Sequence, residues 1–341
     1  MKIVSSSSLS RKFTGERGLL TASFICWSVL LILVPASAFA WGAATHAYLA
    51  RELSQRKLNS QEIYGATVPD LFNIVLDSSD YDYLVDQTHD QYTQVRMKAR
   101  RMGLDAFAFG FVSHNQRWGA DYTAHKKGRT TRRGFVITKS VFLAPKLKPQ
   151  MEEMIDQAGV SNAFLLAGPL ASGLAEPLIE TAIDLLIKRN EDPGIGADLF
   201  HSAQNRPSSV PDLLVAAYAR RFAQHMKVSE EEASEMIRQA EAEFRQLMIN
   251  YGESLSKEEP EAIQDLADQG AALINTLIKS AIGKDVNISP EVIVEFINLA
   301  ISEVEGDYGQ EVAATLSYLK HRNSIIIWLH NILKGNWEGI Y

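Results

Sequence analysis

Apolar residues recur at three- and four-residue spacing along most of the chain, and this periodicity predicts helices. It is clearest in "HAYLARELSQRKL" (46–58), "AIQDLADQGAALINTLIKSAI" (262–282) and "PEVIVEFINLAISEVE" (290–305). Alternating strand patterns are nearly absent, and the best short strand candidate is "GFVITKSVFL", residues 134–143. These patterns together predict an all-α fold built as a multi-helix bundle.

The organisation of the chain favours one domain. Hydrophobic residues make up 46% and charged residues 22% of 341 positions, which is the composition of a globular protein. There is no internal repeat, and residues 188–212, rich in Pro, Gly, Ser and Asn, are predicted to form a loop. We expect a single mostly α-helical domain over 41–341. Its chemical motifs lie in 41–184, and a helical extension covers roughly 229–341.

The first forty residues have the pattern of a secretory signal peptide. Basic residues such as Arg11 precede an apolar run of sixteen residues, 19–34, which is shorter than the roughly 20 residues of a membrane-spanning helix. Ala38 and Ala40 are the small residues that a signal peptidase requires. The pattern predicts cleavage after Ala40, with export to the periplasm or the medium and Trp41 as the first mature residue. A retained N-terminal anchor is the alternative.

Removal of this segment would change both the cysteine content and the charge. Cys26 is the only cysteine, so the mature chain would carry no disulfide, and a metal is the natural cross-link for an exported fold. A chain of this length can also be stable through its core alone. The segment carries a net charge of +3, so its loss takes the chain from −7 to −10. An acidic protein is a poor candidate for stable nucleic-acid binding, although a nuclease whose metals hold the phosphate stays open.

Histidines gather in the first part of the mature chain, where four of eight lie between His46 and His125. On a continuous helix, at about 100° per residue, His114, Asp121 and His125 would share a wedge of about 40°. Two imidazoles and a carboxylate on one face would form a zinc surface. The alternative is an ordinary helix with solvated histidines, and Gly119 inside the pattern weakens the helix prediction.

The predicted N-terminus adds further candidate ligands. The α-amino group and carbonyl of a first residue can chelate a metal as a five-membered ring, and the bulky Trp41 is suited to anchoring such a terminus. His46 follows five positions later and can fold back to the same ion. Asp70, after a proline, and His89, among acidic residues, are weak candidates when each is taken alone.

Taken together, these residues resemble the zinc-dependent phospholipase C family over roughly 41–184. The matching motifs are "WG" with the histidine that follows, "GATVPDLF", "GFVSHNQRWGADYTAH" and, in place of a later His-x-x-x-Glu pair, "LAEPLIETAIDLL". The resemblance implies a helical bundle of the type shared by these phospholipases and the zinc nucleases. The metal ligands that it implies are Trp41, His46, Asp70, His89, His114, Asp121, His125, Glu176 and Glu180.

Two features depart from the family pattern. Six residues separate the helix histidine from the aspartate, whereas the family usually has three, and a kink near Gly119 is one way to absorb the difference. Glu176 stands where the family has a histidine. A carboxylate can still bind zinc, and His201 is an alternative source of the missing imidazole.

The resemblance implies an exported phospholipase C that cleaves phospholipid head groups through a metal-activated water, with two or three Zn²⁺ ions. Asp70 would be the general base and Asp121 would bridge two metals. Trp41 and His46 would serve one ion, His114 and His89 the next, and His125 with Glu180 the last. The single-strand-specific zinc nucleases share the fold, but usually carry D-x-x-Q-P-x-H where this chain has "DYTAH". A non-catalytic metal-binding module that keeps the fold is a third alternative.

Two further segments carry weaker signals. The basic segment "KKGRTTRRG" (126–134) and the apolar C-terminal "SIIIWLHNILKGNWEGIY" (324–341) could both contact a membrane surface peripherally. A solvated loop and a docked helix are the simpler interpretations. His225, His321 and His330 lie on helical patterns far from the cluster and are predicted to be structural.

Overall fold

The all-α prediction is confirmed for the part of the chain that the structure, a computed structural model, describes. These residues are 41–54, 59–74 and 80–333, and they contain helices and no strand. The predicted signal peptide, its cleavage site and the last eight residues of the C-terminal segment lie outside the described residues. Cleavage after Ala40 and export therefore stay predictions.

The helices follow one another with short connections. The first part of the chain contains α2 (Ala43–Leu53), α3 (Ser60–Thr67), the 3₁₀ helix η1 (Val68–Ile74), α4 (Tyr81–Asp90), α5 (Thr93–Met102), α6 (Asp105–His114) and the π-helix η2 (Tyr122–Lys126). The longer helices come next: α7 (Phe135–Gln157), α8 (Ala163–Asn190), α9 (Ile195–Gln204), α10 (Val210–Met226), α11 (Glu230–Ser256), α12 (Glu259–Ile282), α13 (Pro290–Val304) and α14 (Tyr308–Leu333).

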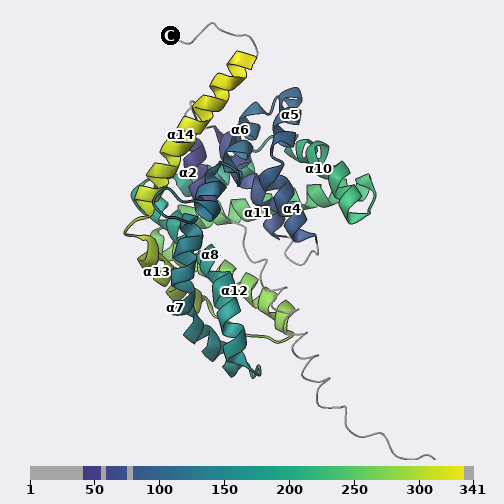
Figure 1. The fold of residues 1–341 in the computed structure, drawn as a ribbon. Coiled ribbons are helices and arrows are strands. Elements are labelled where there is room, and N and C mark those ends of the chain that lie inside the picture. The colour runs from purple at the N-terminus through teal and green to yellow at the C-terminus, as the bar shows by residue number, and fades with distance from the viewer. Residues whose placement is uncertain (1–40, 55–58, 75–79, 334–341) are drawn as a thin grey trace, which may run out of the picture.

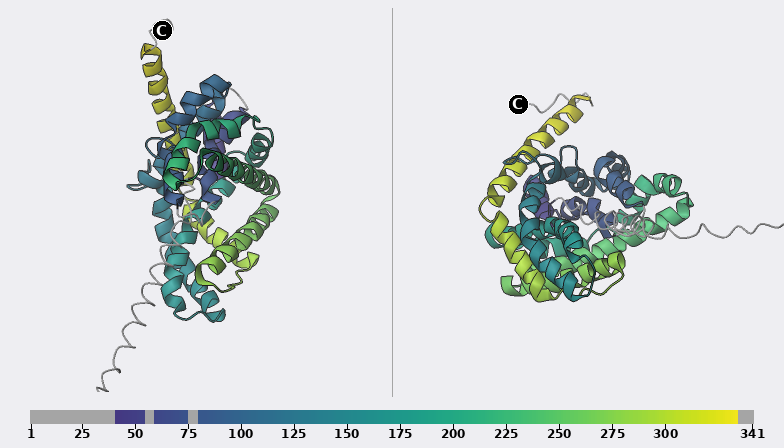
Figure 2. Two further views of the ribbon diagram at one scale, coloured as in Figure 1. Left: turned by 90° about the vertical axis from the view of Figure 1, so that its right-hand side faces the viewer. Right: turned by 60° about the horizontal axis from the view of Figure 1, so that its bottom comes forward.

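The bundle has two parts that share α8 and α11. Helices α2, α4, α5, α6 and α10 lie in the upper half of Figure 1, and α7, α12 and α13 lie in the lower half. Helix α8 contacts α7, α13, α2 and α9, so it joins the two parts. Figure 2 shows α14, in yellow, running along one side of the bundle. One apolar core passes through both parts, from Trp41 to Leu319.

The predicted strand at 134–143 is wrong, because these residues open α7. The buried positions of this helix include Val136, Ser140, Leu143 and Leu147, which are separated by three or four residues. A segment of this length is too short to distinguish the two-residue repeat of a strand from the 3.6-residue repeat of a helix. Packing along α8 selects the helix, and α7 continues through Pro145.

The predicted loop at 188–212 is also largely helical. Helix α8 extends to Asn190, α9 occupies 195–204 and α10 begins at Val210. Gly194 is the residue before α9, and Pro211 lies in the first turn of α10. Glycine and proline therefore mark helix ends here, as their backbone preferences allow, within a segment whose composition is typical of a loop.

The basic segment at 126–134 is tied to α14 through Arg129 and Thr130, while its other basic side chains, Lys126, Lys127, Arg132 and Arg133, are exposed as expected for a solvated loop. The Glu311 carboxylate accepts hydrogen bonds from the backbone N–H groups of Arg129 and Thr130, both at 2.6 Å, and from the Thr130 hydroxyl at 2.6 Å. The Arg129 guanidinium lies over the Tyr318 ring, 4.3 Å from its centroid. Helix α14 therefore docks on the motif-bearing part of the fold. Among the described residues, no helix combines the length and apolarity needed to cross a membrane.

Candidate metal centre

Three groups of histidine and carboxylate side chains converge in the described part of the chain. Within each group, the potential ligand atoms all lie within 4.8 Å of one another. The first group is His46, His114 and Asp121; the second is Asp70, His89 and His114; the third is His125, Glu176 and Glu180. All eight residues are among those predicted as ligands from the sequence.

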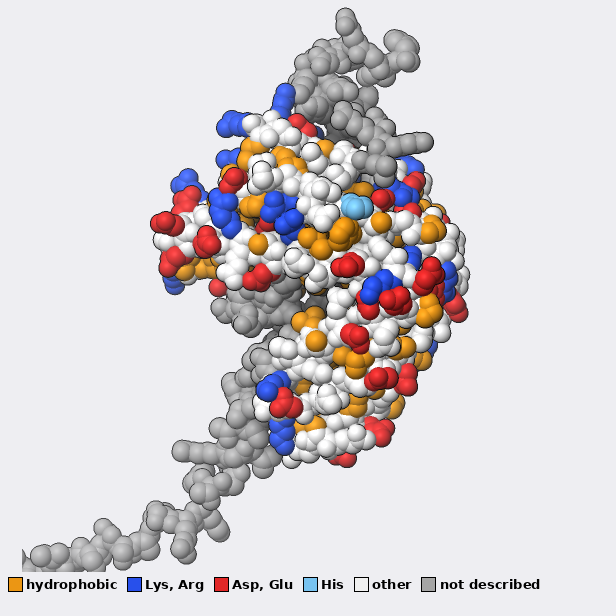
Figure 3. All heavy atoms as spheres, turned by 180° about the vertical axis from the view of Figure 1, so that it is seen from behind, with side chains coloured by type: hydrophobic (Ala, Val, Ile, Leu, Met, Phe, Trp, Pro, Cys, Tyr) orange, Lys and Arg blue, Asp and Glu red, His pale blue; other side chains and the backbone are white. Residues whose placement is uncertain are grey.

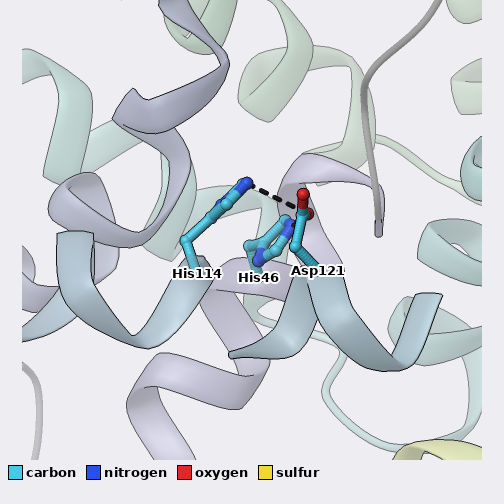
Figure 4. A group of neighbouring side chains, drawn as sticks. All are labelled: His46, His114 and Asp121. Atoms are coloured by element: carbon cyan, nitrogen blue, oxygen red, sulfur yellow. Dashed lines mark ion pairs between the residues drawn. The ribbon is translucent and has the colours of Figure 1, made fainter. Parts of the chain in front are cut away.

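The first group joins α2 to the end of α6 and the turn that follows it. The His46 and His114 rings are stacked, with centroids 4.0 Å apart and an interplanar angle of 14°. The Asp121 Oδ1 atom lies 3.1 Å from His114 Nε2 and 3.8 Å from His46 Nε2. Figure 4 shows the carboxylate facing the two imidazoles, so the three side chains surround one point.

The second group shares His114 with the first and adds side chains from η1 and α4. His89 Nε2 lies 3.3 Å from Asp70 Oδ1 and 3.4 Å from Asp121 Oδ2. The two oxygens of Asp121 thus face different histidines, His114 through Oδ1 and His89 through Oδ2. This is the placement that a carboxylate bridging two ions requires.

Backbone hydrogen bonds orient two of the imidazoles. His89 Nδ1 lies 2.9 Å from the Val85 carbonyl, and His114 Nδ1 lies 2.8 Å from the Ala66 carbonyl. A carbonyl only accepts, so each Nδ1 carries the hydrogen and each Nε2 of the neutral ring presents a lone pair. These Nε2 atoms are 3.1 Å apart. Two lone pairs at this distance repel unless a proton or a metal cation lies between them.

The buried carboxylates of Asp70 and Asp121 favour a positive charge in the first two groups, as the pKa values of the histidines reflect. Burial lowers the pKa of His89, but Asp121 and Asp70 raise it by more, so it lies above its usual value. The pKa of His114 is raised in the same way, again against burial. His46 is different, because burial and the neighbouring His114 hold its pKa well below the usual range. A neutral His46, whose buried Nε2 has no hydrogen-bond partner among the described residues, could offer a lone pair to a metal.

The donor atoms fit a metal. Within the described residues, His46 Nε2, both carboxylate oxygens of Asp121 and Glu180 Oε1 are buried without a hydrogen-bond partner of acceptable geometry. Buried polar atoms are expensive to leave unpaired, and metal coordination is one way in which they are satisfied. Imidazole nitrogens and carboxylate oxygens are ligands that suit zinc.

The third group is the more accessible one. His125 Nε2 lies 2.8 Å from Glu176 Oε1, and these side chains are 10% and 17% exposed. Burial, followed by the charge of Glu176, raises the pKa of Glu180 well above its usual value. A bound cation would offset this repulsion between carboxylates. The structure brings Glu176 to His125, whereas His201, the alternative, is exposed on α9 and belongs to none of the three groups.

The sequence pattern predicts His114, Asp121 and His125 on one continuous helix. The structure brings them near one another in a different way, because the helix is interrupted. Helix α6 ends at His114, and the Asn115 side chain accepts hydrogen bonds from the backbone N–H groups of Arg117 and Trp118, at 2.9 and 3.0 Å. A Cβ atom at Gly119 would lie 2.4 Å from the His114 carbonyl oxygen, so the turn requires glycine there. This turn absorbs the long spacing before η2, a π-helix of the kind that recurs at functional sites.

Trp41 is buried beside this turn. Its indole N–H is shared between the Ala120 carbonyl, at 3.0 Å, and the Thr123 hydroxyl, at 3.1 Å. Its ring stacks on Phe135 with centroids 5.8 Å apart. The side chain thus anchors the start of the described chain near Asp121. Coordination by the Trp41 amine depends on a cleavage that lies outside the described residues, and stays a prediction.

Asp184 is a positioning residue that the sequence analysis missed. Its buried carboxylate accepts hydrogen bonds from Ala44 N at 2.9 Å, Thr45 N at 2.7 Å, Thr45 Oγ1 at 2.6 Å and Tyr251 Oη at 2.9 Å. Burial raises its pKa to about 6 in spite of these bonds. Asp184 fixes the first turn of α2 and so the place of His46. Asp184 follows Glu180 by four residues, so the two carboxylates lie on the same face of a helix. This spacing is the sequence signal that could have placed Asp184 near the site.

Comparison with known proteins gives no match: no family model, curated protein or solved structure matches this chain. The functional assignment therefore depends on the residues and their geometry.

Proposed function

We propose that this chain is a zinc-dependent phosphodiester hydrolase, and that its substrate is a phospholipid cleaved as by a phospholipase C. The observation that supports it is the convergence of the three groups. His114 belongs to two of them, and Asp121 faces four histidines at distances between 3.1 and 3.9 Å. Adjoining cation sites that share ligands are typical of enzymes that cleave phosphate esters.

The residues that would hold the ions follow from the groups. His46, His114 and Asp121 would hold one ion, together with the Trp41 backbone if the chain begins there. Asp70, His89 and His114 would hold a second, and the third group would hold a third. When bound, zinc neutralises charge on phosphate oxygens and lowers the pKa of coordinated water toward neutrality.

Asp70 is positioned to act as the general base. Its Oδ1 atom accepts a hydrogen bond from the Asn73 side chain at 3.0 Å and lies 3.3 Å from His89 Nε2. This oxygen is oriented toward the centre of the site, where a carboxylate can accept the proton of an attacking water. The partly exposed His125 and Glu176 mark the side from which a phosphate would approach.

The net charge of the chain favours a lipid over a nucleic acid as substrate. Figure 3 shows acidic and basic side chains interspersed over one face, without a continuous basic surface. The whole chain has a net charge of −7. Tight, sequence-independent binding of nucleic acids depends on clustered lysine and arginine. The exposed basic residues of α5 and of 126–134 are the clusters that could serve this purpose, and they stand against the overall negative charge.

A non-catalytic metal-binding module is the second candidate. The observation that favours it is burial: the five residues of the first two groups are each at most 2% exposed. A structural metal site is closed, whereas a catalytic site keeps an open position. The accessible third group is what favours the enzyme.

Hydrolysis of a soluble phosphodiester separates these candidates. We expect the purified protein beginning at Trp41 to hydrolyse bis(p-nitrophenyl) phosphate, to lose this activity when its metals are removed by a chelator, and to regain it with Zn²⁺. Phosphatidylcholine vesicles and single-stranded DNA, assayed in parallel, separate the phospholipase from the nuclease. A protein that carries zinc but hydrolyses none of the three would be the binding module, and the proposed function would be wrong.

A further inference from the structure

An apolar cavity adjoins the third group through Glu180. It has a volume of about 450 Å³ and lies among α8, α11, α12 and α13. This volume is in the lower half of the range of small-molecule sites, roughly 300–1,000 Å³. Most of its wall comes from α11, α12 and α13, which are outside the part of the chain that carries the ligand motifs.

The side chains around the cavity are mainly aliphatic. They include Leu174, Leu178, Leu247, Leu266, Leu273 and Ile293. Leu273 is 56% exposed, so it lies at an opening of the cavity to solvent. An aliphatic wall of this kind stabilises a ligand in proportion to the apolar area that the ligand buries.

One end of the cavity reaches the candidate metal centre. Glu180, a member of the third group, lines the cavity, and its Oε1 atom is buried without a hydrogen-bond partner among the described residues. Asn73, which donates to Asp70, also lines it, as does Gly42, which follows Trp41. A ligand in the cavity can therefore place one end beside the proposed ions.

Several other polar side chains of the wall already have protein partners. Tyr251 donates to Asp184 at 2.9 Å, Gln269 donates to the Ser254 hydroxyl at 2.9 Å, and Glu243 accepts from Gln239 at 2.9 Å. Each of these groups already has a partner in the protein, so the wall has few polar groups that are aimed only at a ligand. The wall suits a ligand that is apolar along its length and polar at one end.

We propose that the cavity binds one hydrocarbon chain of the substrate and places the substrate's polar head at Glu180. The ligand is an amphiphile that places one hydrocarbon chain in the cavity, whether or not it carries a second chain. The wall formed by α11–α13 determines the preferred length of that chain. The inference rests on the proposed function only in one respect, namely which bond of the bound substrate is hydrolysed. Binding of the chain needs neither the metals nor the reaction.

Binding of alkyl phosphocholines to the purified protein beginning at Trp41 tests this inference. We expect hexyl, octyl, decyl and dodecyl phosphocholine, each below its micelle concentration in a calorimeter, to bind with increasing affinity. Each added methylene should tighten binding by roughly fourfold, the value of one buried CH₂, until the cavity is full. The substitution Leu273→Asp should weaken dodecyl phosphocholine at least about tenfold, because it places a carboxylate beside the chain.

Matched variants control for folding and for non-specific adsorption. Met97 is 59% exposed on α5, outside the cavity, so Met97→Asp should leave binding unchanged. A Cβ atom at Gly270, on the cavity wall, would meet only the Ile293 Cγ2 atom, at 3.5 Å. Gly270→Ala should therefore fold and bind, whereas Gly270→Leu should fold and bind at least about tenfold more weakly, because its side chain fills the cavity.

The inference would be overturned by an affinity that does not depend on chain length, or by equal weakening by Met97→Asp and Leu273→Asp. An apolar peptide that binds at this cavity when the alkyl series does not would also overturn it. Bis(p-nitrophenyl) phosphate has no alkyl chain, so its hydrolysis tests the proposed function separately. Alkyl binding without hydrolysis would leave the cavity assignment in place and reject the enzyme.

Discussion

Replacing Asp121 with Asn is expected to lower kcat/KM for a soluble phosphodiester by about a thousandfold or more, the scale of losing a central charge-stabilising group. The Asp121 carboxylate is fully buried, and its oxygens lie 3.1 Å from His114, 3.4 Å from His89 and 3.8 Å from His46. An amide is neutral and offers only one oxygen, so it cannot bridge two ions. We expect the zinc content, measured by mass spectrometry, to fall with the activity.

The matched control for this change is Asp212→Asn. Asp212 is exposed and pairs with Arg238 at 2.6 Å, and surface ion pairs contribute little. This variant should keep full activity and zinc content. If Asp121→Asn retained both, Asp121 would not be a ligand and the proposed arrangement of the groups would be wrong.

Replacing Trp41 with Ala is expected to destabilise the protein by about 3–5 kcal/mol, the usual cost of truncating a buried tryptophan. The indole is fully buried, stacks on Phe135 and donates to Ala120 and Thr123. In a domain of this size, the loss corresponds to a decrease in Tm of roughly 5–8 °C. Zinc content should also fall, because the unanchored start of the chain no longer stays beside Asp121.

Thermal unfolding of Trp118→Ala is the comparison for this result. The Trp118 ring is half-buried and its indole donates to the Tyr92 hydroxyl at 2.9 Å. Its truncation should lower the Tm less than Trp41→Ala and leave the zinc content unchanged. Equal effects of the two substitutions on zinc would show that Trp41 has no special part in the site.

The helical fold and the side chains that gather in the candidate metal centre were predictable from the sequence because both leave local signals. Helical periodicity is visible within a few turns, and four of the eight histidines fall between His46 and His125. Gly119 indicated where the helix would break. The turn itself was not predictable, since it depends on the Asn115 side chain binding the backbone of Arg117 and Trp118.

Features that depend on packing between distant segments were not predictable in this way. Residues 134–143 look like a strand until they are packed along α8. Asp184 acts on α2 across 140 residues of sequence, through Ala44. The apolar cavity needs walls from four helices, and no single segment of the sequence shows that their side chains meet around one space.

The metal content of the purified protein beginning at Trp41, measured beside the same protein with one extra residue before Trp41, tests the central claim most directly. We expect two or three zinc ions in the first protein and one fewer in the second, because an added residue displaces the α-amino group from the site. No metal in either protein would contradict the assignment of all three groups.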